Sequence, residues 1–175
     1  MDSHAGVLPV VHSILATTAL AAEIAPDYEI GQPVECRFLN KGLNDTYLVK
    51  TLDDSYVLRV YRLNWRSLSD ILYEVDLLTH LGRRGAPVSV PIARRDGRFS
   101  RIMRMPEGNR HAVLFTYAPG DPPPWPPDEA YCRLYGSAAA EIHNGLDNFC
   151  SDHARFPIDL DYLLDRPLQA ILPFL

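Results

Sequence analysis

Thr46-Tyr-Leu-Val-Lys-Thr-Leu52 is β-prone, Asp53-Asp54 interrupts it, and Tyr56-Val-Leu-Arg-Val-Tyr61 resumes it. This pattern predicts two antiparallel strands joined by a tight turn, and the rest of the chain is organised around them. Because alternate residues of a strand share a face, Arg59 lies on the same face as Val57. A charge in the middle of such a strand indicates a partner on a neighbouring element.

A long helix is predicted directly after this hairpin. Ser67 and Asp70 have the spacing of a capping box, which marks its start. Apolar residues then recur at helical spacing in a stripe that should pack on the hairpin, namely Leu68, Leu72, Val75, Leu78 and Leu81. Glu74 lies in mid-helix, where it can pair with Arg59 to hold an anion. The alternatives are a structural ion pair or two solvent-facing charges.

The composition describes an ordinary globular chain. Its 175 residues, 47% hydrophobic and 22% charged, suffice for one domain, or for one small lobe and part of another. The net charge of −5 argues against a nucleic-acid or anionic-membrane surface, so the arginine clusters at 83–84 and 94–104 are interpreted as solvated faces. No apolar run reaches the length of a membrane span.

Cysteine usage and the N-terminal segment concern the location of the protein. Cys36, Cys132 and Cys150 are odd in number and lack metal-ligand spacing, which favours buried free thiols and a cytoplasmic protein. Residues 7–22 are mostly apolar and end like a signal-peptidase site. However, no Lys or Arg precedes them and Pro9 interrupts them, so a short packing helix is preferred over a signal peptide.

The segment before the hairpin is suited to a phosphate. Residues 34–39 alternate and predict an opening strand, and residues 40–45 predict the turn that follows. Gly42 can take positive φ and Asn44 can bond its own backbone, so this turn can expose several N–H groups. Exposed amides can bind a phosphate, and a purely structural turn is the alternative.

The remaining segments divide the chain into three parts. A hairpin around Asp96-Gly97, a turn at Gly108-Asn109 and an apolar strand at 111–117 complete a sheet-rich lobe, residues 1–117. The proline-rich residues 118–127 predict a hinge or linker, and residues 128–175 the incomplete beginning of a helical lobe. This order is α+β, without alternating βαβ units.

The helical part has its own signals. Asp128 is suited to cap a helix whose buried stripe is expected to consist of Ala130, Leu134, Ser137, Ala138, Ile142 and Leu146. A second helical stretch at 159–172 requires a break near Arg166, because Pro167 follows. The apolar residues 171–175 are expected to pack on a partner or on a missing part of the lobe.

Several segments resemble, in a set order, one family of enzymes. They are Tyr47-Leu-Val-Lys50, Tyr56 to Arg62, Glu74 to Leu81, Pro87 to Pro91, Phe115-Thr-Tyr-Ala-Pro-Gly120, Leu134 to His143 and Phe156 to Leu164. The order is similar to that of the aminoglycoside-phosphotransferase and choline-kinase-like family, with its homoserine-kinase-like members. The resemblance implies a protein-kinase-like N-terminal lobe, an antiparallel sheet with one long helix, followed by the first helices of a C-terminal lobe. It covers the amino-terminal portion of such an enzyme only.

The resemblance also implies a site for the phosphates of ATP. Gly42 and Asn44 would lie in the turn that covers the phosphates. Arg59 stands where the family usually has a lysine that reaches the α- and β-phosphates, and Glu74 matches the glutamate that orients this cation. Arginine in place of lysine is a real change, because its planar fork binds phosphate bidentately but is bulkier.

The adenine would lie closer to the hinge. Val57 would cover the ring, and Phe115 would close the back of the pocket. The backbones of Thr116 and Ala118 would hydrogen-bond the adenine edge. The implied cofactors are ATP and Mg²⁺, and the implied partners are the nucleotide and, in the complete enzyme, a small-molecule acceptor.

The catalytic loop of the family is not found in this sequence. The family supplies the catalytic Asp and the Mg²⁺ ligands from a His-Gly-Asp…Asn loop and a later Asp. His143 to Asn148 is similar only superficially, so His143 is interpreted as a packing or capping residue. We therefore expect a truncated ATP-dependent phosphotransferase that is inactive alone. A non-catalytic nucleotide- or protein-binding module and an α+β domain with structural charges are the alternatives.

Overall fold

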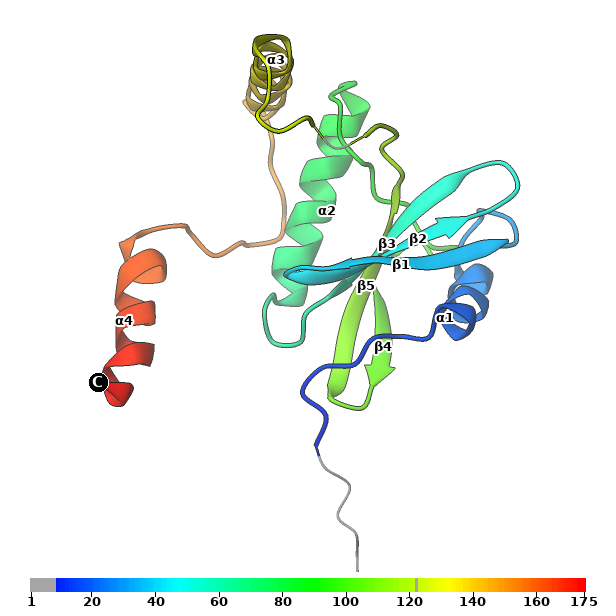
Figure 1. Cartoon of the computed structure of the whole chain (residues 1–175), viewed down its shortest axis with the longest axis horizontal. Helices are drawn as coiled ribbons and strands as arrows, with labels where there is room; N and C mark the ends of the chain where they lie inside the picture. The colour runs from blue at the N-terminus through cyan, green and yellow to red at the C-terminus, as the bar shows by residue number, and fades with distance from the viewer. Residues whose placement is uncertain (1–8, 122) are drawn as a thin grey trace, which may run out of the picture.

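An antiparallel sheet lies at the centre of the computed structural model, which describes residues 9–121 and 123–175 (Figure 1). Its strands have the order β1-β2-β3-β5-β4, with bounds Glu35–Lys41, Asn44–Lys50, Ser55–Tyr61, Gly108–Thr116 and Arg101–Met105. The predicted hairpin is confirmed as β2 and β3. Thr51 closes its loop, because its N–H donates to Asp54 O at 2.9 Å and its hydroxyl accepts from Asp54 N–H at 3.1 Å.

Three of the predicted turns differ from the structure. The turn before β2 is limited to Gly42 and Leu43, and Gly42 does not take positive φ. Asp96-Gly97 forms a turn, with Gly97 at φ 78°, but does not connect two strands. Instead, β4 pairs with β5 through Pro106, which favours a turn because its ring fixes φ. Gly108-Asn109 therefore begins β5 and is not a turn.

Helix α2 (Leu68–Arg83) covers one face of the sheet. Its capping box is confirmed, since the Ser67 side chain accepts from Asp70 N–H and the Asp70 carboxylate accepts from Ser67 N–H. The predicted stripe is wrong at Leu68, which is 44% exposed, whereas Ile71 is buried. At 3.6 residues per turn, Ile71, Val75, Leu78 and Leu81 share one side of the helix, and Leu68 lies at its edge.

Helix α1 (Thr17–Ile24) covers the other face, and η1 (Ala25–Asp27) follows it. Leu20 and Ile24 are fully buried against the strand residues Tyr47, Val49, Leu58, Val60, Ala112 and Leu114. The interpretation of residues 94–104 as a solvated face is wrong for Arg94 and Arg101. Both are half-buried and pair with Asp27, so they fasten η1 to the sheet.

The carboxyl-terminal helices pack less than predicted. They are α3 (Glu129–Gly145), the π-helical turn η2 (Asp161–Asp165), α4 (Arg166–Ile171) and η3 (Leu172–Phe174). Asp128 caps α3 as predicted, by accepting from Tyr131 N–H at 2.7 Å. The buried stripe is wrong: no residue of α3 is buried and Leu134 is 68% exposed, because nothing in the described chain covers that face.

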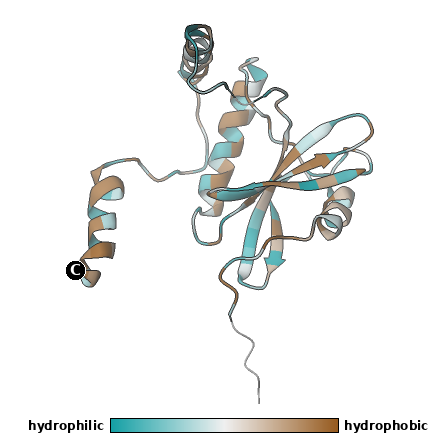
Figure 2. Cartoon of the chain, viewed as in Figure 1, coloured by the Kyte–Doolittle hydropathy of each residue, from teal (hydrophilic) through white to brown (hydrophobic). Residues whose placement is uncertain are grey.

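The helix break, His143 and two cysteines of the carboxyl-terminal part were also predicted from the sequence. The break near Arg166 takes the form of η2, whose wider turn accommodates the missing N–H of Pro167. Cys132 and Cys150 are exposed, so their predicted burial is wrong. His143 is exposed in the last turn of α3, and its carbonyl accepts from the N–H of the C-cap residue Leu146. Hydrophobic positions recur along α4, which lies apart from the sheet (Figure 2). Among the described helices, none is long and apolar enough to cross a membrane.

Candidate functional site

Arg59 and Glu74 meet in an ion pair between β3 and α2. Arg59 Nη1 donates to Glu74 Oε1, and the Tyr61 hydroxyl donates to Glu74 Oε2 at 3.0 Å. The strand fixes this arrangement, because Arg59 and Tyr61 lie on the same face. The Arg59 and Glu74 side chains are 32% and 27% exposed, so the pair is anchored in the lobe and open to a ligand.

Aromatic rings fix the plane of the guanidinium. Arg59 Cζ lies 4.8 Å from the ring centroid of Phe115 and 5.9 Å from that of Tyr61. Phe115 is itself buried in a cluster with Tyr61, Ile71, Val75 and Val113. Such a cation over an aromatic face is stabilised by the ring quadrupole. The side chain therefore enters the site with a preformed orientation.

The electrostatics keep the Arg59 guanidinium and the Tyr61 hydroxyl in their protonated forms. Burial alone would lower the pKa of Arg59, but the Glu74 carboxylate and Tyr61 oppose it, and the pKa is raised. Burial, followed by the charge of Glu74, raises the pKa of Tyr61. At neutral pH the site thus presents a permanent cation that is held by a carboxylate and a neutral phenol.

Gly42 and Asn44, the residues expected beside the phosphates, lie at the end of the sheet where β2 begins and β3 ends. Gly42 is exposed, and a Cβ built on it would meet nothing within 4 Å, so no contact requires a glycine there. Its N–H donates to Asn44 O at 3.1 Å. Asn44 pairs with Tyr61 in the ladder, and its Oδ1 accepts from Arg62 N–H at 3.2 Å. The turn thus lies near the ion pair. However, the Gly42 N–H and the Asn44 Oδ1 are already hydrogen-bonded within the protein.

The residues expected beside the adenine lie where β3 begins and β5 ends. Val57 is half-buried, on the face of Arg59, and pairs with Phe115. Thr116 N–H donates to Val90 O at 2.9 Å, so an adenine contact from Thr116 would use its carbonyl oxygen. Ala118 is exposed, and no described residue bonds its N–H or its carbonyl. Its backbone is therefore available to a ligand.

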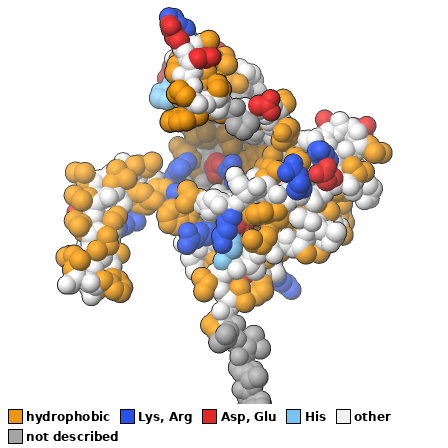
Figure 3. All heavy atoms as spheres, in the orientation of Figure 1, with side chains coloured by type: hydrophobic (Ala, Val, Ile, Leu, Met, Phe, Trp, Pro, Cys, Tyr) orange, Lys and Arg blue, Asp and Glu red, His pale blue; other side chains and the backbone are white. Residues whose placement is uncertain are grey.

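Concave surfaces lie near the residues that follow β5. One is lined by Thr51, Leu52, Asp53, Asp54, Ser55, Tyr117 and Pro119; Val57 and Arg59 do not line it. Figure 3 shows a hollow between the side chains of α3 and those of the sheet, in which basic and acidic side chains lie. Arg59 and Glu74 lie on the side of the sheet that α2 covers, where their side chains are 32% and 27% exposed.

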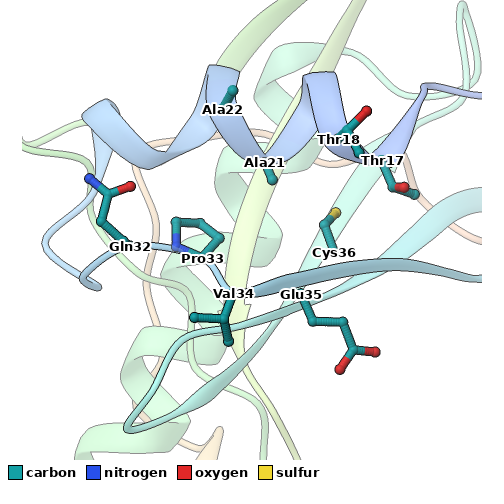
Figure 4. A pocket seen from close by; sticks show the side chains of 9 residues that line it. All are labelled: Thr17, Thr18, Ala21, Ala22, Gln32, Pro33, Val34, Glu35 and Cys36. Carbon is teal, nitrogen blue, oxygen red and sulfur yellow. The ribbon is translucent and has the colours of Figure 1, made fainter.

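A different pocket lies on the opposite face, between α1 and β1. Its lining consists of Thr17, Thr18, Ala21, Ala22, Gln32, Pro33, Val34, Glu35 and Cys36. Figure 4 shows Cys36 directed toward α1 and Glu35 directed away from it. Burial, and then the charge of Glu35, raises the pKa of the Cys36 thiol, so the thiol is a poor nucleophile. This pocket is separate from the ion pair.

The described residues do not supply a metal site. Among residues 9–121 and 123–175, no group of three or more His, Cys, Asp or Glu side chains could hold a metal ion. Glu74, the carboxylate of the candidate site, already accepts from Arg59 and Tyr61. These residues therefore do not fit Mg²⁺, which prefers several oxygen ligands in octahedral geometry.

Sequence analysis missed a second arginine, Arg110, whose side chain is 0% exposed. Its Nη2 donates to Asp45 Oδ2 at 2.7 Å, and its Nε to Tyr61 O at 2.8 Å. Strand alternation could have revealed it, because Arg110 shares a face with the buried residues Ala112 and Leu114. A charge in such a position needs an equally buried partner, and Asp45 is 1% exposed.

Comparisons with known proteins agree with this architecture. The family model described as the phosphotransferase enzyme family matches residues 35–171. Solved structures with the same fold include a microcompartment-associated aminopropanol kinase, with a TM-score of 0.66 and 24% identity over 87% of this chain and 48% of that one. A second is the amicoumacin kinase in complex with AMP-PNP and Ca²⁺, with a TM-score of 0.65 and 20% identity over 90% and 54%. The fold is thus the α+β, kinase-like N-terminal lobe that the sequence predicts.

The chain belongs to the phosphotransferase enzyme family. An uncharacterized protein of Synechocystis sp. is 41% identical over 167 residues, which are 95% of this chain and 46% of that protein. A homoserine kinase of Granulibacter bethesdensis is 30% identical over 136 residues, 76% of this chain and 40% of the kinase. The chain therefore spans less than half the length of these two relatives.

Proposed function

We propose that this chain is the nucleotide-binding portion of an ATP-dependent phosphotransferase that acts on a small-molecule hydroxyl. The observation that carries the proposal is the ion pair of Arg59 and Glu74, whose side chains are 32% and 27% exposed in a kinase-like lobe. A polyphosphate needs a cation beside it, and a partly buried cation needs an acid that holds it while the site is empty. Family membership adds the reaction class.

The proposed division of labour follows from the placement of each group. Arg59 binds the α- and β-phosphates through N–H groups that Glu74 does not use, because a guanidinium carries five N–H donors. Asn44 lies opposite Tyr61, and Gly42 lies in the turn that precedes Asn44, so these two residues would cover the phosphates. Glu74 and the Tyr61 hydroxyl hold the guanidinium in place.

The adenine would lie toward the hinge. Val57 would cover the ring from the face of Arg59, and Phe115 would close the back of the pocket as the buried neighbour of the guanidinium. The free Ala118 backbone and the Thr116 carbonyl would bond the adenine edge. These contacts would orient the base so that its phosphates reach Arg59.

Catalysis itself requires groups that the described residues lack. Mg²⁺, when bound, would neutralise charge on the phosphates, and its ligands and the catalytic Asp would come from a further segment of the complete enzyme. We thus propose residues 1–117 as the nucleotide lobe, 118–127 as the hinge and 128–175 as the start of the helical lobe. The exposed apolar side chains of α3 and α4 support this division, since a further part of the lobe would cover them.

The acceptor is proposed to be an amino-alcohol. The names of two similar proteins, homoserine kinase and aminopropanol kinase, specify acceptors that carry both an amine and a hydroxyl. A cytoplasmic location is proposed because Cys36, Cys132 and Cys150 are all free thiols. The alternative function is a non-catalytic nucleotide- or protein-binding module, which the exposed apolar face of α3 favours.

Nucleotide titration tests the proposal. A fluorescent ATP analogue should bind the wild-type chain, and Arg59→Ala should weaken binding by at least about 10-fold, because a charge-assisted phosphate contact is lost. Arg104→Ala is the matched control, since Arg104 is exposed on β4 and should leave the affinity unchanged. Equal affinities of wild type and Arg59→Ala would contradict the proposal and favour a protein-docking module.

A phosphate-transfer assay tests the second part of the proposal. The chain alone should transfer no radiolabelled phosphate from ATP to an amino-alcohol, with or without Mg²⁺, because the described residues lack a metal-ligand set. Metal-dependent turnover by this chain alone would overturn the proposed truncation.

A further inference from the structure

The segment of residues 9–16, termed here the N-terminal strap, is bound to the turn between β4 and β5 and to the first residues of β2. The Ser13 N–H and hydroxyl donate to Glu107 Oε1 and Oε2 at 3.0 and 2.8 Å, at the turn between β4 and β5. His12 Nε2 lies 3.1 Å from Asp45 Oδ2 at the start of β2, and Leu15 N–H donates to the Tyr47 hydroxyl at 3.0 Å. Polar contacts thus anchor an extended segment that precedes α1.

Arg110 joins the strap to the strands beneath it. Its Nη1 donates to the carbonyl of Ser13 at 3.2 Å and lies 3.5 Å from Glu107 Oε1. The same guanidinium donates to Asp45 and to the carbonyls of Val60 and Tyr61 at 2.7, 3.1 and 2.8 Å. All three of its nitrogens therefore bond the strap, the start of β2 or the end of β3.

The charges of this network are fixed by the contacts of the strap. Burial alone would raise the pKa of Glu107, but the bonds from Ser13 and the charge of Arg110 keep that pKa below its ordinary value. The Glu107 side chain is nevertheless almost fully buried. An ionised carboxylate in such a place is stable only while its donors stay in position. The strap is therefore a required part of the network.

This network ends at the candidate phosphate site. Asp45 adjoins Asn44 and pairs with Lys41 across the turn that would cover the phosphates. Tyr61, whose carbonyl accepts from Arg110, donates its hydroxyl to Glu74, and Glu74 accepts from Arg59. Arg110 lies on the α1 face and Arg59 on the α2 face, so the connection passes through the backbone of β3.

We propose that the N-terminal strap and Arg110 position the nucleotide site, by fixing both the phosphate-covering turn and the Tyr61 hydroxyl that orients Glu74 and Arg59. This inference rests on the proposed function. Arg110 is a positioning residue, because it touches Arg59 only through Tyr61 and Glu74. Release of the strap should loosen the phosphate end of the site and leave the adenine end at the hinge unchanged.

Variants of the strap contact test the proposal in the full chain. Ser13→Ala removes one donor to Glu107, and Glu107→Gln removes the charge, whereas Ser13→Thr keeps the hydroxyl. Both disruptive variants should raise the Kd for the fluorescent ATP analogue by about 2-fold to 30-fold, the usual range for indirect coupling. The Kd for adenosine should not change, and Ser13→Thr should retain the wild-type value. Val11→Ala is the control on the same strap, because Val11 is exposed.

Amide exchange provides a readout that does not depend on a nucleotide. Exchange should become faster at residues 42–44 and 60–62 in Ser13→Ala and Glu107→Gln, and stay unchanged at 116–118. A lower Tm with unchanged exchange and unchanged affinity for both ligands would overturn the proposal and leave the strap a structural role. If wild type and Arg59→Ala bind the analogue alike, the proposed function fails. The amide exchange rates of Ser13→Ala and Glu107→Gln then test the positioning role without a nucleotide. Faster exchange at residues 60–62 supports positioning by the strap, and unchanged exchange overturns it.

Discussion

The two arginines of the sheet differ in how completely the protein satisfies them. Arg110, on the α1 face, is fully buried and uses all three nitrogens on Asp45, the strap and the carbonyls of β3. Arg59, on the α2 face, is 32% exposed and donates to the single carboxylate of Glu74. A guanidinium without spare donors cannot itself bind an anion, whereas one with spare donors can.

The difference in burial between Arg110 and Arg59 determines how much each should contribute to the free energy of unfolding. Removal of one partner from a buried ion pair strands a charge in a low-dielectric interior, while a pair open to water contributes little to stability. The stability of the fold should therefore depend mainly on Arg110, and direct contact with the phosphates on Arg59.

Arg110→Ala should remove the buried network around Asp45 and destabilise the fold. It leaves Asp45 and two strand carbonyls without their donor, so the free energy of unfolding should fall by about 3–5 kcal/mol. Urea unfolding followed by circular dichroism measures the change, and Arg104→Ala should stay within about 0.5 kcal/mol of wild type. A loss for Arg110→Ala no larger than that of this control would show that the buried network does not support the fold.

Tyr61→Phe tests the link between the two arginines, because the Tyr61 carbonyl accepts from Arg110 and the Tyr61 hydroxyl donates to Glu74, the partner of Arg59. The ring and the carbonyl bonded by Arg110 remain, and only the hydroxyl bond to Glu74 is lost. Stability should fall by about 1 kcal/mol, the usual net value of one hydrogen bond. Binding of the ATP analogue should weaken, since Glu74 then orients Arg59 less well. An unchanged affinity would indicate that Arg59 needs no second anchor.

The pH dependence of stability should reveal Glu107. Its pKa in the folded protein lies below the ordinary 4.5, so its contribution is fully present above about pH 4.5 and is lost as the pH falls through the folded pKa. Wild type should therefore lose part of its stability advantage over Glu107→Gln on acidification, measured by urea midpoints from about pH 7 to about pH 3. A constant difference over that range would contradict the ionised state of Glu107.

The smallest effect is expected in α3. Leu134→Ala should change the stability of this chain by less than about 0.5 kcal/mol, because the side chain is 68% exposed. Ile24→Ala, in contrast, should cost about 2–5 kcal/mol, since Ile24 is fully buried against the sheet. Urea unfolding of both variants provides the comparison. A large loss in Leu134→Ala would mean that α3 is covered in solution, for example by a second copy of the chain.

Local signals predicted the features that depend on a few neighbouring residues. The hairpin, the capping box at Ser67 and the Asp128 cap follow from turn and capping chemistry, and all three are present. The Arg59–Glu74 pair was also predictable, because charge interrupts an otherwise apolar strand and the next helix carries an acid within reach.

Features that depend on distant partners were not predictable in the same way. Arg110 and Asp45 are 65 residues apart, and only their alternation with buried neighbours connects them. The apolar stripe of α3 predicts burial, but a stripe is buried only where another element covers it. The hairpin expected at Asp96-Gly97 failed because the flanking arginines pair with η1, while Pro106 directs the strand reversal.

The preference for ATP over adenosine tests the central claim most directly. Calorimetric titration of wild type and Arg59→Ala with each ligand isolates the contribution of the phosphates, because the hinge contacts are common to both. Wild type should bind ATP at least about 10-fold more tightly than adenosine, and Arg59→Ala should abolish this preference without weakening adenosine binding. An equal preference in both proteins would contradict the assignment of the Arg59–Glu74 pair to the phosphates.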